Sequence, residues 1–211
     1  MKRNNDLSEA QIDVLREVMN VGAGNAATSM SRLIDKKVEM QIPSVNMLPF
    51  EQVMDLFGGP DAPVAGMMVT VSGEVGGQVF FILNLDDAQT FLRKMTDQPF
   101  LRLQTGRMDE LTQSALEEAG NMIICAYVAA LSDFTGLSIR PSIPSVTIDM
   151  AGAMLSHGLI EVSPHTDFAI IMDTEISTSD VTNGMNGHFL FLPNPGSFNE
   201  FIKSVGMTCN G

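Results

Sequence analysis

Two stretches of the chain decide its fold: DVLREVMN at residues 13–20 and SALEEAGN at residues 114–121. In both, a glutamate is followed three residues later by an asparagine, and an Asp or Ser precedes the glutamate by four. Positions i, i+4 and i+7 lie on one stripe of an α-helix. The sequence therefore predicts two helices that each hold a carboxylate beside a carboxamide.

The repeat extends well beyond these octapeptides. With a constant offset of 101 residues, identities continue to position 45 and include Pro43 and Pro144. Further along, the offset becomes 110, so nine additional residues are expected between Val146 and Gly187, in a longer loop or hairpin. Two copies indicate a duplicated supersecondary unit rather than a solenoid.

Each copy has the pattern of a helix, three strands and a closing helix. Ser8 with Gln11 predicts a capping box for a first helix that runs toward Ile34, and Asp109 is the expected N-cap of a second helix that runs toward Phe134. The expected strands are 38–48, 66–72, 78–84, 137–148, 168–177 and 188–192, and the closing helices are 86–95 and 196–205. The fold class is therefore α+β, with one antiparallel-rich sheet of about six strands. Residues 1–211 are expected to form a single domain of two pseudo-symmetric halves, about 8–98 and 109–207.

Proline and glycine mark special positions within these elements. Pro43 and Pro144 fall inside expected strands, and because proline cannot donate to a ladder, each indicates an edge strand or a bulge. Gly22 and Gly24 lower the helix propensity of the first long helix. They indicate either close helix packing or a local break.

Composition excludes several classes of partner. The net charge is −13, from 25 acidic and 12 basic residues, which disfavours nucleic acid and anionic membrane surfaces. No apolar run is long enough to span a bilayer, and the first residues lack a secretory h-region. The two cysteines do not suggest a disulfide scaffold, and Cys125 is predicted to be a small buried hydrophobe. We therefore expect a cytoplasmic protein.

The Glu/Asn pair has two interpretations. It is either an ordinary solvated helix face or a site that was kept when the unit was duplicated. Asparagine is a poor residue for a helix interior, so its occurrence in both copies favours a site. A carboxamide can orient a water molecule or donate to a developing oxyanion, and phosphoryl transfer often needs little more than such positioning. The histidines at 157, 165 and 188 have no ligand spacing, so no metal site is expected.

The motif resembles the signature of the CheC/CheX/FliY phosphatases of bacterial and archaeal chemotaxis. That signature is Asp or Ser, three residues, Glu, two residues, Asn, then 22 residues and Pro, and both copies satisfy it. The runs NVGAGNAA at residues 20–27 and PSVTIDM at residues 144–150 are also similar to CheC-type members. The resemblance covers nearly the whole chain, and two intact copies are typical of the CheC type.

The resemblance implies a CheC-like fold and hydrolysis of the aspartyl phosphate on the response regulator CheY. In that interpretation each asparagine orients the attacking water and each glutamate pairs with a lysine of the regulator. The catalytic residues would be Glu17, Asn20, Glu118 and Asn121, with Asp13, Ser114, Pro43 and Pro144 in supporting positions. The Mg²⁺ that neutralises the phosphoryl oxygens would belong to the regulator, so no cofactor is expected on this chain.

The resemblance also implies binding to the receptor deamidase CheD. Asp149 begins the run DMAGAM, for which we expect a short helix, and we assign this aspartate as a CheD contact. The alternative is an N-cap aspartate followed by a packing helix.

Three hypotheses for the function stay open. The chain is a CheY-phosphate phosphatase, a module that binds the regulator without hydrolysis as FliM is expected to do, or a scaffold that sequesters CheD. Retention of Glu and Asn in both copies favours the enzyme. Because the duplication already supplies a pseudo-twofold unit, a monomer is a reasonable expectation.

Overall fold

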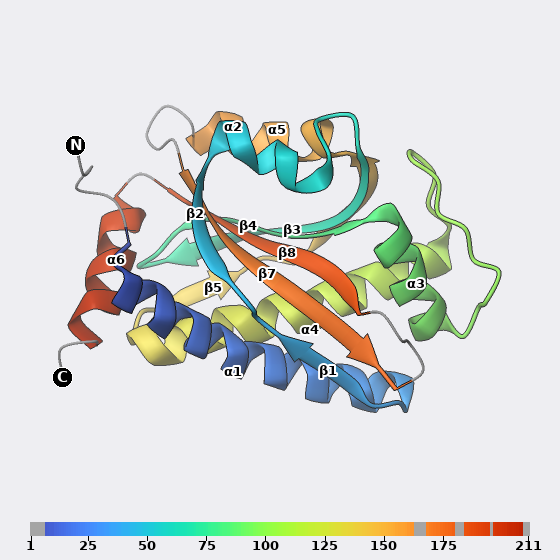
Figure 1. Cartoon of the computed structure of the whole chain (residues 1–211), viewed down its shortest axis with the longest axis horizontal. Coiled ribbons are helices and arrows are strands. Elements are labelled where there is room, and N and C mark those ends of the chain that lie inside the picture. Colours follow the sequence, from blue (N-terminus) through green and yellow to red (C-terminus); the bar gives the residue numbers. More distant parts are fainter. Residues whose placement is uncertain (1–6, 163–167, 180–183, 195, 209–211) are drawn as a thin grey trace.

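Figure 1 shows the computed structural model of the chain, which describes residues 7–162, 168–179, 184–194 and 196–208. The strands are β1 Val38–Gln41, β2 Val45–Pro49, β3 Pro63–Gly73, β4 Gly77–Asn84, β5 Ile139–Pro141, β6 Ser145–Met150, β7 Phe168–Thr178 and β8 Met185–Pro193. The helices are α1 Glu9–Ile34, α2 Phe50–Val53, α3 Leu85–Thr96, α4 Glu110–Thr135, α5 Ala151–Val162 and α6 Ser197–Thr208, with a 3-10 turn η1 Met54–Phe57. The α+β prediction is confirmed.

The two long helices begin where the sequence predicts. The Ser8 side chain accepts a hydrogen bond from the Gln11 backbone N–H, and the Ser8 backbone N–H donates to Gln11 Oε1 at 2.9 Å, which completes the capping box. Asp109 accepts from the Thr112 N–H at 2.7 Å, and hydrogen bonds from the Thr112 backbone and side chain lower the pKa of Asp109. In each helix the N-cap side chain therefore satisfies one of the first-turn N–H groups that have no partner within the helix.

All strands pair antiparallel in one sheet with the order β1-β7-β8-β4-β3-β5, in which β2 also pairs with β7 and β6 also pairs with β3. The edge segment of each half thus joins the hairpin of the other half. The two halves interlock, and the centre of the sheet is the β4–β8 pair.

The edge strands differ from the prediction. The strand expected over 38–48 is broken into β1 and β2, and the strand expected over 137–148 is broken into β5 and β6. Within the described residues the sheet therefore has eight strands rather than about six. Gln41 pairs with Glu175 and Val45 with Met172, so three residues, 42–44, face two residues of β7. The second copy has the same extra residue, at 142–144. Each proline lies inside such a bulge, where it removes no ladder hydrogen bond.

The sheet separates two apolar layers. Met67, Phe81 and Phe189 face the cluster formed with α1, α3, α4 and α6, while Phe80 and Leu190 face the smaller cluster formed with α2, η1 and α5. This alternation places the two long helices side by side on one face together with α3 and α6, while α2, η1 and α5 cover the other face (Figure 1). Methionine fills part of this core, because Met67 and Met172 are fully buried.

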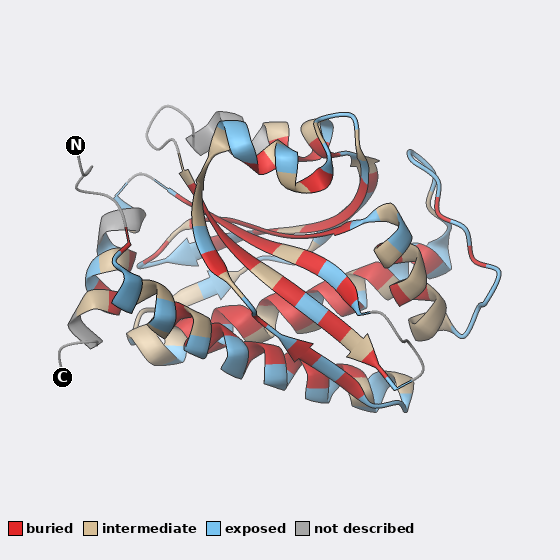
Figure 2. Ribbon diagram, in the orientation of Figure 1, coloured by how far each residue is buried: buried red, intermediate tan, exposed pale blue. Residues whose placement is uncertain are grey.

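Gly22 allows α1 and α4 to pack closely. A Cβ at this position would lie 2.8 Å from Tyr127 Cδ1, whereas a Cβ at Gly24 would meet nothing within 4 Å. The helix is continuous through both glycines, so the alternative of a local break is wrong and the packing interpretation holds for Gly22. The outer faces of both helices stay exposed, as Figure 2 shows.

Candidate active site

The two predicted sites lie at opposite edges of the sheet. Glu17 and Asn20 are exposed residues of α1 beside the bulge between β1 and β2. Glu118 and Asn121 are exposed residues of α4 beside the bulge between β5 and β6. The strand order puts β1 at one end of the sheet and β5 at the other. Each site is therefore built from the long helix and the edge segment of the same half.

The α1 site holds its asparagine in place. Asn20 Oδ1 accepts from the Ile42 backbone N–H at 2.8 Å, and Asn20 Nδ2 donates to the Ile42 carbonyl at 3.3 Å and to the Arg16 carbonyl at 2.9 Å. Both edges of the carboxamide thus contact the backbone of the residue before Pro43. We call this pair of bonds between Asn20 and Ile42 the carboxamide clamp. Its geometry leaves the Asn20 side chain fastened to the protein rather than presented to a ligand.

The α4 site leaves its asparagine open. In the part of the chain that the structure describes, Asn121 Nδ2 donates no hydrogen bond, and Oδ1 accepts only a weak one from Cys125 Sγ at 3.4 Å. The Ile143 carbonyl, which corresponds to the clamped carbonyl of Ile42, accepts instead from Ser142 Oγ at 3.1 Å. A cavity of about 600 Å³ lies beside Asn121 and Glu118. Two copies of one motif therefore have different local structures.

The supporting positions also differ between the copies. Asp13 forms an exposed ion pair with Arg16 at 2.9 Å, whereas Ser114 lines the α4 cavity. The residue that corresponds to Arg16 is Glu117, which also lines that cavity and accepts from Gln113 Nε2 at 2.8 Å. The α4 site is consequently the more acidic of the two, and it favours a partner with positive charge.

Both motif glutamates are available for a partner. Glu17 and Glu118 are exposed, and neither forms a hydrogen bond or an ion pair with another residue that the structure describes. An exposed carboxylate beside a carboxamide can accept a bond from a lysine while the amide contacts water or phosphate.

Cys125 is a site residue that the sequence reasoning missed. The prediction of a small buried hydrophobe is wrong, because Cys125 is half-buried and lines the α4 cavity one helical turn beyond Asn121. Burial raises the pKa of its thiol, so the neutral S–H donates to Asn121 Oδ1. The signal in the sequence was its position four residues after Asn121, which places both side chains on the same stripe of the helix.

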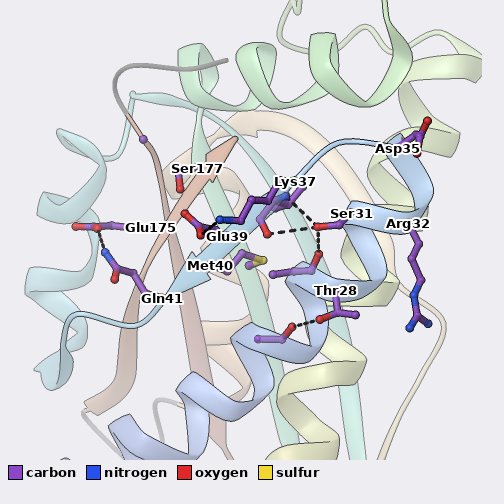
Figure 3. A pocket seen from close by; sticks show the side chains of 14 residues that line it. Thr28, Ser31, Arg32, Asp35, Lys37, Glu39, Met40, Gln41, Glu175 and Ser177 are labelled. Carbon is purple, nitrogen blue, oxygen red and sulfur yellow. Dashed lines mark hydrogen bonds and ion pairs between the residues drawn. The ribbon is translucent and has the colours of Figure 1, made fainter. Parts of the chain in front are cut away.

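A larger groove of about 1,000 Å³ lies elsewhere, between the second half of α1 and strand β1 (Figure 3). None of the predicted site residues lines it. Its charged and polar side chains contact one another, as in the Lys37–Glu39 ion pair at 2.6 Å and the Gln41–Glu175 hydrogen bond. The groove is therefore larger than the α4 cavity, but it does not contain the chemistry that the motif predicts.

Asp149 lies apart from both sites. It is a half-buried residue of β6 opposite Val64, and α5 begins two residues later, so the alternative of an N-cap aspartate is wrong. Its neighbour Ile148 faces the main core, which turns Asp149 to the other side of the sheet. There it lines a cavity of about 340 Å³ that also contacts Met154 of α5.

The histidines do not gather at a site. His188 is a half-buried residue of β8, and its Nδ1 contacts Asp173 Oδ1 at 2.8 Å. His165 and the side chain of His157 lie outside the described residues. Within the described ranges, no three His, Cys, Asp or Glu side chains come together as a metal site would require. No helix in those ranges has the length and apolar character needed to cross a membrane.

The chain matches the model of the CheC-like family over residues 11–47 and 111–148, the segments that contain both motifs. It is 37% identical over 202 residues to the CheY-P phosphatase CheC of Bacillus subtilis strain 168, across 96% of this chain and 97% of that protein. The fold is similar to that of Thermotoga maritima FliY, with a TM-score of 0.73 and 18% identity across 97% of this chain and 98% of that one. A chain of the CheX–CheY–BeF3–Mg²⁺ complex from Borrelia burgdorferi has a TM-score of 0.50 and 16% identity, across 82% of this chain and 96% of that one.

Proposed function

Because the chain belongs to the CheC-like family, we propose that it hydrolyses the aspartyl phosphate of a CheY-type response regulator. The observation that carries the proposal is the exposed Glu118–Asn121 pair beside the α4 cavity, in which Asn121 Nδ2 donates no hydrogen bond to another described residue. A full-length relative named as a CheY-P phosphatase supports the substrate. A similar fold found in a complex of CheX with CheY supports a regulator as the partner.

The proposed mechanism needs two groups from this chain. Asn121 enters the acidic pocket of the regulator, where its Nδ2–H donates to a water or to the phosphoryl group and its Oδ1 accepts from the water. The carboxamide thereby holds the water in line with the scissile P–O bond without removing its proton. Glu118 pairs with a lysine of the regulator and fixes α4 against it. Mg²⁺ bound by the regulator would neutralise the phosphoryl oxygens.

The α1 pair is proposed to act in the same way, but only after the carboxamide clamp opens. Asn20 must leave the Ile42 backbone before its amide can contact a ligand. Rate at this site therefore depends on how often the clamp is open, because only the free carboxamide is competent.

We further propose CheD as a partner, at Asp149. The support is its position on the face of the sheet opposite α4, where it lines an apolar cavity with Met68, Phe80 and Met154. A charge reversal, Asp149→Lys, is expected to weaken CheD binding at least tenfold. The lysine would repel the positively charged surface that complements the aspartate. Unchanged affinity by calorimetry, with unchanged thermal stability, would remove this part of the proposal.

The test of phosphatase activity is the loss of ³²P from labelled regulator. The wild type should accelerate this loss, and the double variant Asn20→Ala/Asn121→Ala should return it to the regulator's own rate. Asn25→Ala is the matched control, because Asn25 is an exposed asparagine of α1 that lies off the motif stripe. Absence of any acceleration by the wild type contradicts the proposal, and so does full activity in the double variant.

A further inference from the structure

Two isoleucines at the same position of the repeat have opposite environments. Ile42 precedes Pro43 and is 2% exposed, whereas Ile143 precedes Pro144 and is 91% exposed. Ile42 belongs to the main hydrophobic core, while Ile143 extends into solvent at the rim of the α4 cavity. The side chain of an isoleucine exposed to this extent contributes almost no burial energy to folding. Its burial against a partner would contribute to binding instead.

The segment that carries Ile143 is fastened to the sheet. The Ser142 backbone N–H donates to the Thr70 carbonyl at 2.9 Å, and Ser142 Oγ accepts from the Thr70 N–H at 3.1 Å. The Ser142 hydroxyl in turn donates to the Ile143 carbonyl, and Pro144 fixes the following φ angle. Ile143 is therefore held outward by its neighbours, and a partner that covers it would order little additional chain.

Ile143 stands beside the polar groups of the proposed function. It lines the same cavity as Glu118 and Asn121, in which the glutamate offers negative charge and the asparagine offers an amide. A protein that presents a lysine to Glu118 and a phosphorylated pocket to Asn121 must therefore place some of its surface over Ile143. Protein interfaces typically combine such a central apolar anchor with a polar surround.

We propose that Ile143 is a docking residue for the response regulator, covered by an apolar patch next to the phosphorylated pocket of that protein. This inference rests on the proposed function and assigns the first docking event to the α4 site. The corresponding Ile42 is buried and cannot serve in this way. The occupant is the phosphorylated regulator rather than a second copy of this chain, since the charged and amide groups of the motif share the surface.

The test compares Ile143→Ser with Phe100→Ser. Phe100 is 90% exposed and does not line the α4 cavity, so it is a matched control for loss of an exposed apolar side chain. Ile143→Ser should raise KM for the phosphorylated regulator about tenfold and leave kcat unchanged, because the lost contact is made equally in the ground and transition states. It should also raise by a similar factor the Kd for regulator loaded with Mg²⁺ and beryllofluoride. Phe100→Ser should change neither value, and both variants should keep the wild-type Tm.

Unchanged KM and Kd in Ile143→Ser would overturn the inference, as would an equal effect of Phe100→Ser. A shift of Ile143→Ser toward the monomer in sedimentation, with unchanged KM and Kd, would make a second copy the occupant and also overturn it. Failure of the proposed function has a different signature. In that case the wild type binds the beryllofluoride-loaded regulator through Ile143 but does not accelerate hydrolysis, so the docking role stands without the activity.

Discussion

The carboxamide clamp predicts that two equivalent substitutions have different consequences. Asn20 makes two hydrogen bonds to the Ile42 backbone. At about 1 kcal/mol net for each bond, opening the clamp costs about 2 kcal/mol, which leaves the α1 site free about one thirtieth of the time. If the two free sites are equally active, Asn121→Ala lowers the rate of dephosphorylation about thirtyfold, and Asn20→Ala lowers it by less than a tenth.

Stability should show the reverse pattern. Asn20→Ala removes the partners of the Ile42 N–H and C=O. Because Ile42 is 2% exposed, the loss is expected to cost about 1–3 kcal/mol, or a fall in Tm of about 2–12 °C. Asn121→Ala loses only the weak bond from Cys125 and should stay within about 0.5 kcal/mol of the wild type. The assays are ³²P release under saturating regulator and calorimetric unfolding of the same preparations. Equal loss of rate in the two single variants, or an unchanged Tm in Asn20→Ala, would refute the clamp.

Four further substitutions and one chemical modification test the packing and the site. Gly22→Ala should destabilise the fold by about 1–3 kcal/mol, because its Cβ would lie 2.8 Å from a Tyr127 ring carbon, while Gly24→Ala should stabilise it by about 0.8 kcal/mol; denaturant titration measures both. Tyr127→Phe should raise the free energy of unfolding by about 1 kcal/mol, because the buried Tyr127 hydroxyl has no hydrogen-bond partner among the described residues. The Thr174 hydroxyl is near it but also has no partner there. Burial raises the pKa of Tyr127, so the folded state disfavours the phenolate and the wild type loses stability as the pH rises above about 10. In thermal melts over a series of pH values, the Phe variant should lose less stability than the wild type. Alkylation of Cys125 with a small maleimide should block most hydrolysis, and Cys125→Ala should be protected, as rate and mass spectrometry together will show.

Local signals predicted the helices well and the connections between halves poorly. The capping box at Ser8 and the aspartate at position 109 depend on residues three apart, so they can be read directly from the sequence. The break at Pro43 was indicated only as an edge or a bulge, because a proline inside a strand pattern permits both. Which hairpin an edge segment joins depends on contacts more than 100 residues apart, as in Met47 with Ile170, and no local pattern carries that information.

The motif predicted which residues share a stripe, and the structure agrees in both copies. It did not predict that Asn20 is clamped and Asn121 is open, because both copies have an asparagine and an isoleucine at the matching positions. Burial of Ile42 and exposure of Ile143 arise from tertiary packing, which a motif of fixed spacing does not describe. The half-buried position of Cys125 has the same origin, because a helix that is apolar on most sides does not reveal which side meets a cavity.

The exchange of edge strands has a consequence for how the protein can be divided. Strands β1 and β2 pair with the hairpin of the second half, and β5 and β6 pair with that of the first. Cutting the chain between the halves therefore leaves a row of unpaired backbone N–H and C=O groups on each fragment. Such rows are templates for pairing between chains, so each fragment alone would tend to aggregate. Produced together, the fragments can cover each other's rows and rebuild the sheet without a covalent link.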